Sequence, residues 1–158
     1  MSGSWAQKIQ GGREASGTPG SAVAADFLWR GPFRGIKDDR ATEKLVEDIG
    51  TAMPTTRTYT PRLGAMLELA ETELTTEQLP HILEMAIKQI ESGTADGSGS
   101  SGYTYTYAMQ NTALNTISTY TFETGDDDAA EEMEFSFCES FTLNFVKGET
   151  AKMVAPRL

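Results

Sequence analysis

Apolar and polar residues alternate over residues 133–145, and this is the strongest pattern in the chain. A period of two is typical of a β-strand with one buried face. Glu139 falls on the apolar parity, where a carboxylate is costly unless it is paired. We expect a β-bulge near Cys138 to turn Glu139 outward, with pairing to a cation from another segment as the alternative. The apolar parity consists of Met133, Phe135, Phe137, Phe141, Leu143 and Phe145.

Weaker runs of the same kind predict further strands. Residues 63–69 alternate between apolar and other side chains, and residues 103–109 and 117–124 are rich in the Tyr, Thr and Phe that strands favour. Residues 26–36 are apolar and aromatic but are broken by glycine and proline, which predicts strand pieces joined by a turn or bulge. The charged residues 38–50 fit either a short helix or a hairpin, and periodicity does not separate the two.

One segment has the three-to-four spacing of an amphipathic helix, and we predict a helix over residues 76–92. Thr75 and Gln78 form a T-x-x-Q capping box, Pro80 lies near the start, and Ser92-Gly93 ends the element. Its apolar stripe would pack against the phenylalanine row of residues 133–145. The fold class is therefore mainly β (α+β): an antiparallel β-sandwich or barrel with one amphipathic helix. The stripe consists of Leu79, Ile82, Leu83, Ala86, Ile87 and Ile90, with Glu84, Lys88, Gln89 and Glu91 on the other side.

Residues 1–25 are rich in Gly, Ala, Ser and Thr, and we predict an extended N-terminal arm there, followed by one domain over residues 26–158. Trp5 is a large apolar side chain with little around it in the sequence to bury it, so the arm is expected to dock on something, such as a neighbouring subunit.

Charge changes this picture more than composition does. The 158 residues carry 23 acidic and 13 basic side chains, a formal net charge of -10. No Lys or Arg occurs from Gln89 to Val146, so all charged side chains of this span are acidic. A surface formed by these residues would repel nucleic acid. A solvated loop that aids solubility is the plain alternative. The acidic residues of this span are Glu91, Asp96, Glu123, Asp126, Asp127, Asp128, Glu131, Glu132, Glu134 and Glu139.

Candidate chemistry is sparse. Cys138 has no second cysteine to pair with, and no apolar run reaches the roughly 20 residues of a membrane helix, so we expect no disulfide scaffold and no membrane insertion. Residues 97–102 match G-x-G-x-x-G, but a helix precedes them and a strand follows, opposite to a dinucleotide site. The acidic run lacks the glycine of a calcium loop. His81 is expected to be a surface or boundary residue. We expect no catalytic residue, metal or cofactor.

Several short motifs, in their order along the chain, resemble those of the tail tube (major tail) proteins of long-tailed bacteriophages. They begin with Gly12-Arg13-Glu14, Gly17-Thr18-Pro19 and Leu28-Trp29-Arg30-Gly31. In the second half they are Tyr120-Thr121-Phe122-Glu123-Thr124-Gly125-Asp126, Ala130-Glu131-Glu132-Met133, Glu139-Ser140-Phe141-Thr142-Leu143 and Gly148-Glu149. The resemblance spans nearly the whole chain. Members of this family are usually longer, and residues 153–158 end where another strand would start.

The resemblance implies a β-sandwich or barrel flanked by a helix, whose subunits form rings, typically hexameric, that stack into a hollow tube through which DNA passes. It implies a virion protein, present in the host cytoplasm during assembly, whose partners are copies of itself and other tail proteins such as tape measure, terminator and chaperone. The runner-up is a β-sandwich binding or decoration module of a virion or cell surface that uses exposed Tyr and Trp.

Two surfaces follow from this hypothesis. An acidic lumen would keep DNA from adhering, and we assign to it Asp126, Asp127, Asp128, Glu131, Glu132 and Glu134. Contacts between subunits are expected from the arm, from residues 37–50 and from the Ser/Gly loop. The residues expected in these contacts are Trp5, Trp29, Lys37, Asp38, Asp39, Arg40, Glu43 and Leu45, and for Trp29 a place in the core is an equal alternative.

Overall fold

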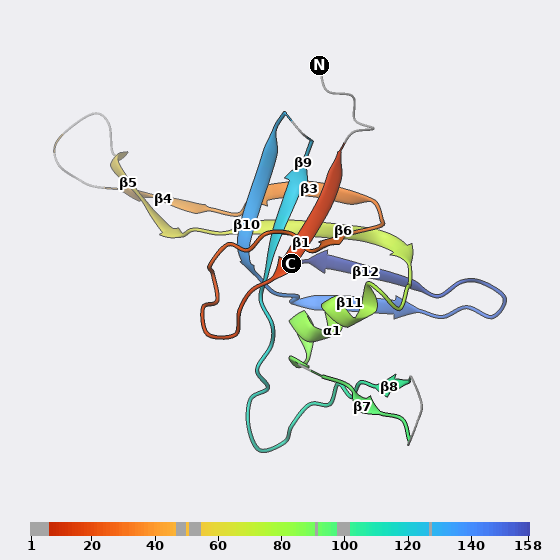
Figure 1. Cartoon of the computed structure of the whole chain (residues 1–158). Helices are drawn as coiled ribbons and strands as arrows, with labels where there is room; N and C mark the ends of the chain where they lie inside the picture. The colour runs from red at the N-terminus through yellow and green to blue at the C-terminus, as the bar shows by residue number, and fades with distance from the viewer. Residues whose placement is uncertain (1–6, 47–49, 51–54, 91, 98–101, 127) are drawn as a thin grey trace.

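The structure of the chain is a computed structural model that describes residues 7–46, 50, 55–90, 92–97, 102–126 and 128–158 (Figure 1). Trp5 and Asp127 lie outside the described residues, so the expectations placed on them are not addressed.

Two four-stranded sheets form the body of the molecule (Figure 1). Sheet A has the order β10-β9-β1-β2, with strands Ala130–Ser136, Tyr120–Gly125, Lys8–Arg13 and Phe27–Leu28. Sheet B has the order β11-β12-β6-β3, with strands Ser140–Asn144, Lys152–Arg157, Ala65–Glu73 and Phe33–Asp38. Every pairing among the described strands is antiparallel. The mainly β fold with one helix is therefore confirmed.

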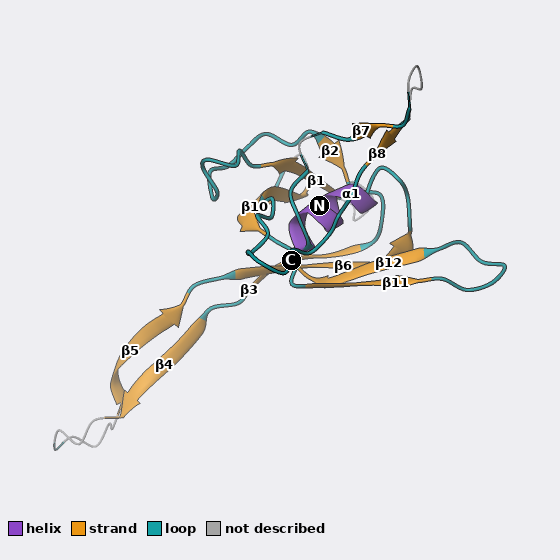
Figure 2. Ribbon diagram, turned by 90° about the horizontal axis from the view of Figure 1, so that it is seen from below, coloured by secondary structure: helices purple, strands orange, loops and turns teal. Residues whose placement is uncertain are grey.

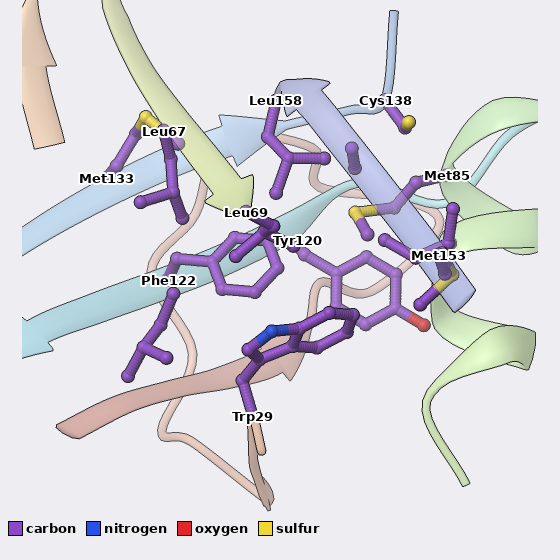
Figure 3. Close-up of a cluster of buried hydrophobic side chains, with 13 residues drawn as sticks. Trp29, Leu67, Leu69, Met85, Tyr120, Phe122, Met133, Cys138, Met153 and Leu158 are labelled. Carbon is purple, nitrogen blue, oxygen red and sulfur yellow. The ribbon is translucent and has the colours of Figure 1, made fainter. Parts of the chain in front are cut away.

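The hydrophobic core fills the space between these sheets, which lie as two layers with the helix α1 (Leu79–Ala86) between them (Figure 2). Sheet A contributes Phe122 and Met133, sheet B contributes Leu67 and Leu69, and α1 contributes Met85 (Figure 3). Alternation along β6 places Leu67 and Leu69 in the core at 0% exposure, as their spacing predicted. Packing of apolar faces from two sheets and a helix is the main source of stability in such a layered domain.

The helix α1 is shorter than the predicted span of residues 76–92. Thr75 does act at its start, because Gln78 N donates to Thr75 Oγ1 at 3.2 Å, but this turn precedes a helix that begins at Leu79. Residues of the predicted polar side are also covered: Glu84 is 9% exposed. The physical reason is that α1 lies between two layers and is covered on more than one side, so a single apolar stripe does not describe it.

The prediction of an extended arm over residues 1–25 is wrong for residues 8–13, which form β1. This strand lies between β9 and β2, with Ile9 1% exposed in the core. Its sequence, KIQGGR, shows no apolar alternation. At Gly11 the rings of Phe27 and Phe122 pack directly against the backbone, in the place that a side chain would take. A Cβ at Gly11 would lie 2.7 Å from the Phe27 ring, so close approach rather than apolar alternation defines this strand.

Residues 133–145 form two strands rather than one. β10 ends at Ser136 in sheet A and β11 begins at Ser140 in sheet B, so the chain changes layers at residues 137–139. Glu139 is exposed in this crossover, and Arg157 Nε lies 2.9 Å from its Oε2, so the alternative of pairing with a cation is confirmed. The bulge lies earlier, between Met133 and Ser136.

The prediction that the phenylalanine row packs against the helix is also wrong for part of the row. Phe135, Phe137 and Phe145 are 53%, 45% and 71% exposed. Phe135 has a φ of 56°, which an L side chain adopts at a cost, and this turn of the backbone points its ring away from the core.

The strands β4 (Ala41–Val46) and β5 (Thr55–Arg62) pair as a two-stranded antiparallel hairpin. We call this hairpin the β4–β5 arm. It continues β3 and β6 beyond the edge of the sandwich and projects away from the body (Figures 1 and 2). Of the segment 38–50, for which a helix and a hairpin were both open, residues 41–46 form a strand of this hairpin, and residues 47–49 lie outside the described part of the chain.

The predicted strand over residues 103–109 is largely absent. β8 (Tyr103–Thr104) pairs with β7 (Thr94–Ala95), and residues 105–119 have no strand. Tyr103, Tyr105, Met109 and Leu114 are exposed there, at 62%, 55%, 76% and 99%. These residues have a high propensity for strands, but a strand forms only where a second strand is available to pair with it. The G-x-G-x-x-G match joins β7 to β8, and its residues 98–101 lie outside the described part of the chain. At the C-terminal end, residues 152–157 are themselves the strand β12, between β11 and β6.

Candidate functional site

The β9–β10 hairpin carries the carboxylates assigned to the lumen. At its tip, Asp126 Oδ1 accepts hydrogen bonds from Asp128 N at 3.0 Å and Ala129 N at 2.9 Å, so Asp126 holds the turn. Asp128 is exposed. Glu131, Glu132 and Glu134 follow on β10 and are all exposed, and none of them forms an ion pair with the described part of the chain.

Strand register separates these carboxylates. Glu132 lies opposite Glu123 on the outer face of sheet A, where Gln10 Nε2 donates to Glu123 Oε2 at 2.5 Å. Glu131 lies opposite Thr124 and shares the parity of Met133, which is on the core side of the sheet. Two carboxylates directly opposite one another repel, and on the neighbouring strand β1 the same outer face carries Gln10 and Lys8.

A groove of about 580 Å³ runs beside β10, between this strand and the segment where the β4–β5 arm joins β6. Glu132 and Glu134 line it from β10, and Leu63 lines it from the segment between β5 and β6. A second hollow of about 420 Å³ continues it past Glu131 toward Arg40. Three apolar side chains on its walls are well exposed: Leu63, Phe135 and Phe137, at 74%, 53% and 45%.

Ion pairs hold the base of the β4–β5 arm. Asp39 Oδ2 lies 2.9 Å from Arg62 Nη2 and 3.4 Å from Arg157 Nη2, which joins the arm to β12. Arg40 pairs with Asp38 across one residue. These pairs are exposed, so each contributes little to stability. Lys37 pairs with Glu68 on β6 at 3.5 Å, still within sheet B.

The arm itself presents its side chains to solvent. Leu45, Val46 and Tyr59 are 39%, 76% and 45% exposed. Tyr59 Oη donates to Glu43 Oε2 at 2.5 Å across the hairpin, and this bond raises the pKa of Tyr59. A two-stranded hairpin with no third strand or covering layer has little stability of its own in water.

Trp29 does not belong to this surface. Its side chain is 4% exposed and packs in the core with Leu69 and Tyr120 (Figure 3), so the alternative of a core residue is confirmed and the expectation of a contact with a neighbouring subunit is wrong. The reason is its place next to β2: Trp29 N donates to Ile9 O, which turns the residue onto the inner face of sheet A.

A buried carboxylate that the sequence did not single out fastens the segment after β1. Glu14 is 3% exposed and accepts four hydrogen bonds. Oε2 accepts from Gly20 N and Thr119 Oγ1, both at 2.6 Å. Oε1 accepts from Phe135 N at 2.8 Å and Thr121 Oγ1 at 3.1 Å. Burial alone would raise the pKa of Glu14, but the bonds from Thr119, Gly20, Phe135 and Thr121 outweigh it and lower the pKa.

A second polar cluster joins α1 to sheet A. Glu84 Oε2 accepts hydrogen bonds from Tyr120 Oη at 3.2 Å and Ser118 Oγ at 3.4 Å, and Arg13 Nη1 lies 3.5 Å away. Burial raises the pKa of Glu84, while Arg13 and the two hydroxyls partly oppose that rise. His81 Nδ1 meets Tyr120 Oη at 3.1 Å, and its ring stacks on Phe27 at 4.0 Å between centroids. Burial lowers the pKa of His81, a boundary residue as expected.

Sequence reasoning could not find these two clusters, because neither has a pattern. Glu14 comes two residues after the Gly11-Gly12 pair, in a stretch without alternation. Glu84 lies on the side of the helix that the apolar stripe predicts to be exposed to solvent. Their partners come from positions up to 121 residues away in the chain. Both clusters have a structural role: each one connects segments that lie far apart in the sequence by hydrogen bonds.

The thiol of Cys138 and the acidic side chains show no arrangement for nucleophilic or metal chemistry in the described part of the chain. Cys138 Sγ donates to Ser140 O at 3.3 Å, and burial raises its pKa to about 11, so the thiol is protonated at neutral pH. Across the described residues, no group of three or more His, Cys, Asp or Glu is placed to hold a metal ion. No helix in the described part of the chain is long and apolar enough to cross a membrane.

Comparison of the chain with protein-family models, with curated proteins and with solved structures gives no match.

Proposed function

We propose that this chain is a self-assembling structural protein of a bacteriophage tail, whose copies form stacked rings that build the hollow tube for DNA. The β4–β5 arm supports this proposal most directly. It projects from the body with Leu45, Val46 and Tyr59 exposed, and a bare two-stranded hairpin needs a covering surface to be stable. A surface on a second copy satisfies this need when rings stack or close.

The charge of sheet A supports the second part of the proposal, an acidic lumen. Glu123 and Glu132 lie side by side on the outer face of the sheet, and Asp128 is exposed at the tip of the same hairpin. Facing a channel, this surface repels the phosphate backbone and lets DNA pass without adhering. The proposed setting is the virion, with tape measure, terminator and chaperone proteins as further partners and the host cytoplasm as the place of assembly.

A variant without the arm tests this proposal. Asp39 N donates to Gly64 O at 2.8 Å, so replacing residues 40–63 by Asn-Gly leaves a two-residue hairpin turn between β3 and β6. We expect the variant to remain a folded monomer by circular dichroism and analytical ultracentrifugation, and to form no tubes in negative-stain electron microscopy. Normal tubes from this variant would refute the role of the arm.

A point-variant pair sharpens the same test. Tyr59→Ser removes an exposed aromatic side chain from the arm, and Leu114→Ser removes a more exposed apolar side chain outside it. We expect only Tyr59→Ser to weaken tube formation.

A binding or decoration module is the second candidate, and one observation favours it. Tyr103, Tyr105, Met109 and Leu114 form an exposed apolar stretch outside the sandwich, of the kind that binds ligands or partners. Concentrated wild-type protein that stays monomeric would favour this candidate over the tube.

A further inference from the structure

The β11–β12 turn, residues 145–151, presents apolar side chains to solvent at one end of sheet B. Phe145 and Val146 are 71% and 56% exposed and come directly after β11. Glu149 N donates to Val146 O at 3.1 Å, and Gly148 has a φ of 88°, as the third residue of a type II turn requires. The backbone therefore closes this turn by itself, and the two apolar side chains are available for another contact.

The turn and the groove beside β10 lie at opposite ends of the same strand. The groove includes Arg157 and Leu158, at the end of β12, whereas the turn leads into the start of β12 at Lys152. The six residues of this strand span about 20 Å. Figure 2 shows the turn extending from the sheet on the side away from the β4–β5 arm. Because β12 is held between two strands, the turn can reach such a groove only in a second copy.

The groove combines an apolar wall with uncompensated negative charge. Leu63, Phe135 and Phe137 are exposed on its walls, and the rings of Phe135 and Phe137 pack edge to face. Glu132 and Glu134 line it from β10, and neither pairs with a cation among the described residues. An occupant that fits this surface has exposed apolar side chains beside a cation that needs a partner.

Most lysines and arginines of the described chain already interact with another group, including Arg157 in the groove. Lys44, Lys88 and Lys147 form no ion pair with a described residue. Lys88 is half-buried in a separate hollow. Lys44 lies on the β4–β5 arm, which leaves the sandwich at the same end as the groove, so its contact would join like ends of two copies. Lys147 lies at the opposite end, beside the two exposed apolar side chains.

The position of Lys147 in the turn favours such a contact. It is the second residue of the type II turn, between Val146 and Gly148, and its side chain is exposed. The acidic residue of the turn, Glu149, acts on β12: together with the larger effect of Glu71, its charge raises the pKa of Lys152. The positive charge of Lys147 is therefore the one that the turn offers to a partner.

We propose that the β11–β12 turn of one copy docks into the groove beside β10 in the next copy. Lys147 then lies beside Glu134, and the apolar side chains of the turn cover the aromatic wall of the groove. At about 580 Å³ the groove holds several side chains. The contact joins opposite ends of two copies, so it propagates along the strand direction instead of closing as a pair. This inference rests on the proposed assembly and names one contact between stacked copies.

Two consequences follow for the surfaces described above. Glu134, first assigned to the lumen, belongs to the contact between copies, while Glu123, Asp128 and Glu132 remain for the lumen. The β4–β5 arm projects from the groove end of the sandwich, so it faces the same copy that docks in the groove. Water reaches the proposed ion pair, so raising the salt concentration is expected to weaken assembly.

A charge exchange tests this contact in the full-length chain. Lys147→Glu and Glu134→Lys each replace the attraction by a repulsion, and we expect each to raise the protein concentration needed for tube formation by about threefold or more. The double variant restores opposite charges and is expected to assemble close to the wild-type concentration. Lys88→Glu reverses another lysine without an ion pair among the described residues and is the matched control, with little expected effect.

The apolar part of the contact has a separate test. Phe145→Ser removes a ring that the proposed contact buries, and we expect it to raise the concentration for tube formation by about tenfold. Leu114→Ser removes a more exposed apolar side chain outside the turn and is the matched control. Thermal unfolding of each monomer confirms that a loss of assembly is not a loss of folding.

The outcomes separate this inference from the proposed function. If the double variant assembles no better than the single reversals, or if the reversals and Phe145→Ser assemble like wild type, the docking of the turn is overturned. Rescue of Glu134→Lys by Lys44→Glu instead of Lys147→Glu would overturn it in favour of the arm. If the variant lacking residues 40–63 fails to assemble in either case, the proposed function stands without this contact. Wild-type protein that never associates would overturn both claims.

Discussion

Replacing Glu14 by Gln should destabilise the fold far more than a change of one atom suggests. Each carboxylate oxygen accepts one backbone N–H, from Gly20 at 2.6 Å and from Phe135 at 2.8 Å, in a site that is 3% exposed. An amide has one oxygen and one NH₂ group. Whichever way the amide turns, its NH₂ group faces a backbone N–H that cannot rotate away, and one buried donor is left without an acceptor.

The expected loss follows from these contacts. A hydrogen bond to a charged group contributes about 1.5 to 3 kcal/mol, and an unsatisfied buried donor costs a similar amount, so we expect Glu14→Gln to lower the free energy of unfolding by about 3 kcal/mol. For a chain of this length that corresponds to a fall in Tm of about 6 to 12 °C. Urea unfolding followed by tryptophan fluorescence measures it, and Glu77→Gln, which changes a carboxylate that is 73% exposed, is the matched control with little expected effect.

The pH dependence provides an independent check. Because the pKa of Glu14 is lowered in the folded state, its stabilisation is fully present above the unfolded value near 4.5 and is lost as the pH falls through the folded pKa. The gap between wild type and Glu14→Gln should therefore be constant from pH 7 to about pH 5 and narrow below it. A gap under about 0.5 kcal/mol at pH 7, or one that does not narrow in acid, would refute the reasoning.

Three further predictions concern the core and its polar neighbours. Leu69→Ala empties a fully buried site and should lower the free energy of unfolding by about 3 kcal/mol, whereas Leu63→Ala, at 74% exposure on the same alternation, should change it little in urea titrations. The pKa of Glu84 is raised, so its ionisation opposes folding near neutral pH, and wild type should gain stability relative to Glu84→Gln as the pH falls from 7 toward 4.5; a constant difference would contradict this. The pKa of Cys138 is raised to about 11, so the native thiol should react with a disulfide reagent at pH 8 much more slowly than the thiol in urea, and equal rates would show that it is exposed.

The sequence predicts the sandwich best where alternation and one-sided burial coincide. Leu67 and Leu69 on β6 are an example, since their spacing alone places them in the core. The pattern fails at β1, where Gly11 and Gly12 carry no apolar signal and the strand exists because aromatic rings and backbone from distant segments pack against it.

The contrast between a local sequence pattern and packing against distant segments also explains residues 133–145. Their alternation is continuous in sequence, but a strand that crosses from one sheet to another exposes the residues at the crossing, such as Phe137. The clusters around Glu14 and Glu84 depend on partners brought together by the fold, which no local pattern encodes. The residues predicted to contact other subunits fall in different parts of the fold: Glu43 and Leu45 lie on β4, Lys37 and Asp38 end β3 in sheet B, and Trp29 lies in the core.

Electron microscopy of the purified wild-type chain over a range of concentrations tests the central claim most directly. The proposed function predicts rings, and tubes of uniform width with a central channel, that appear above a threshold concentration and disappear when residues 40–63 are replaced by Asn-Gly. Protein that stays monomeric at every concentration, with an unchanged folded state, would contradict the account.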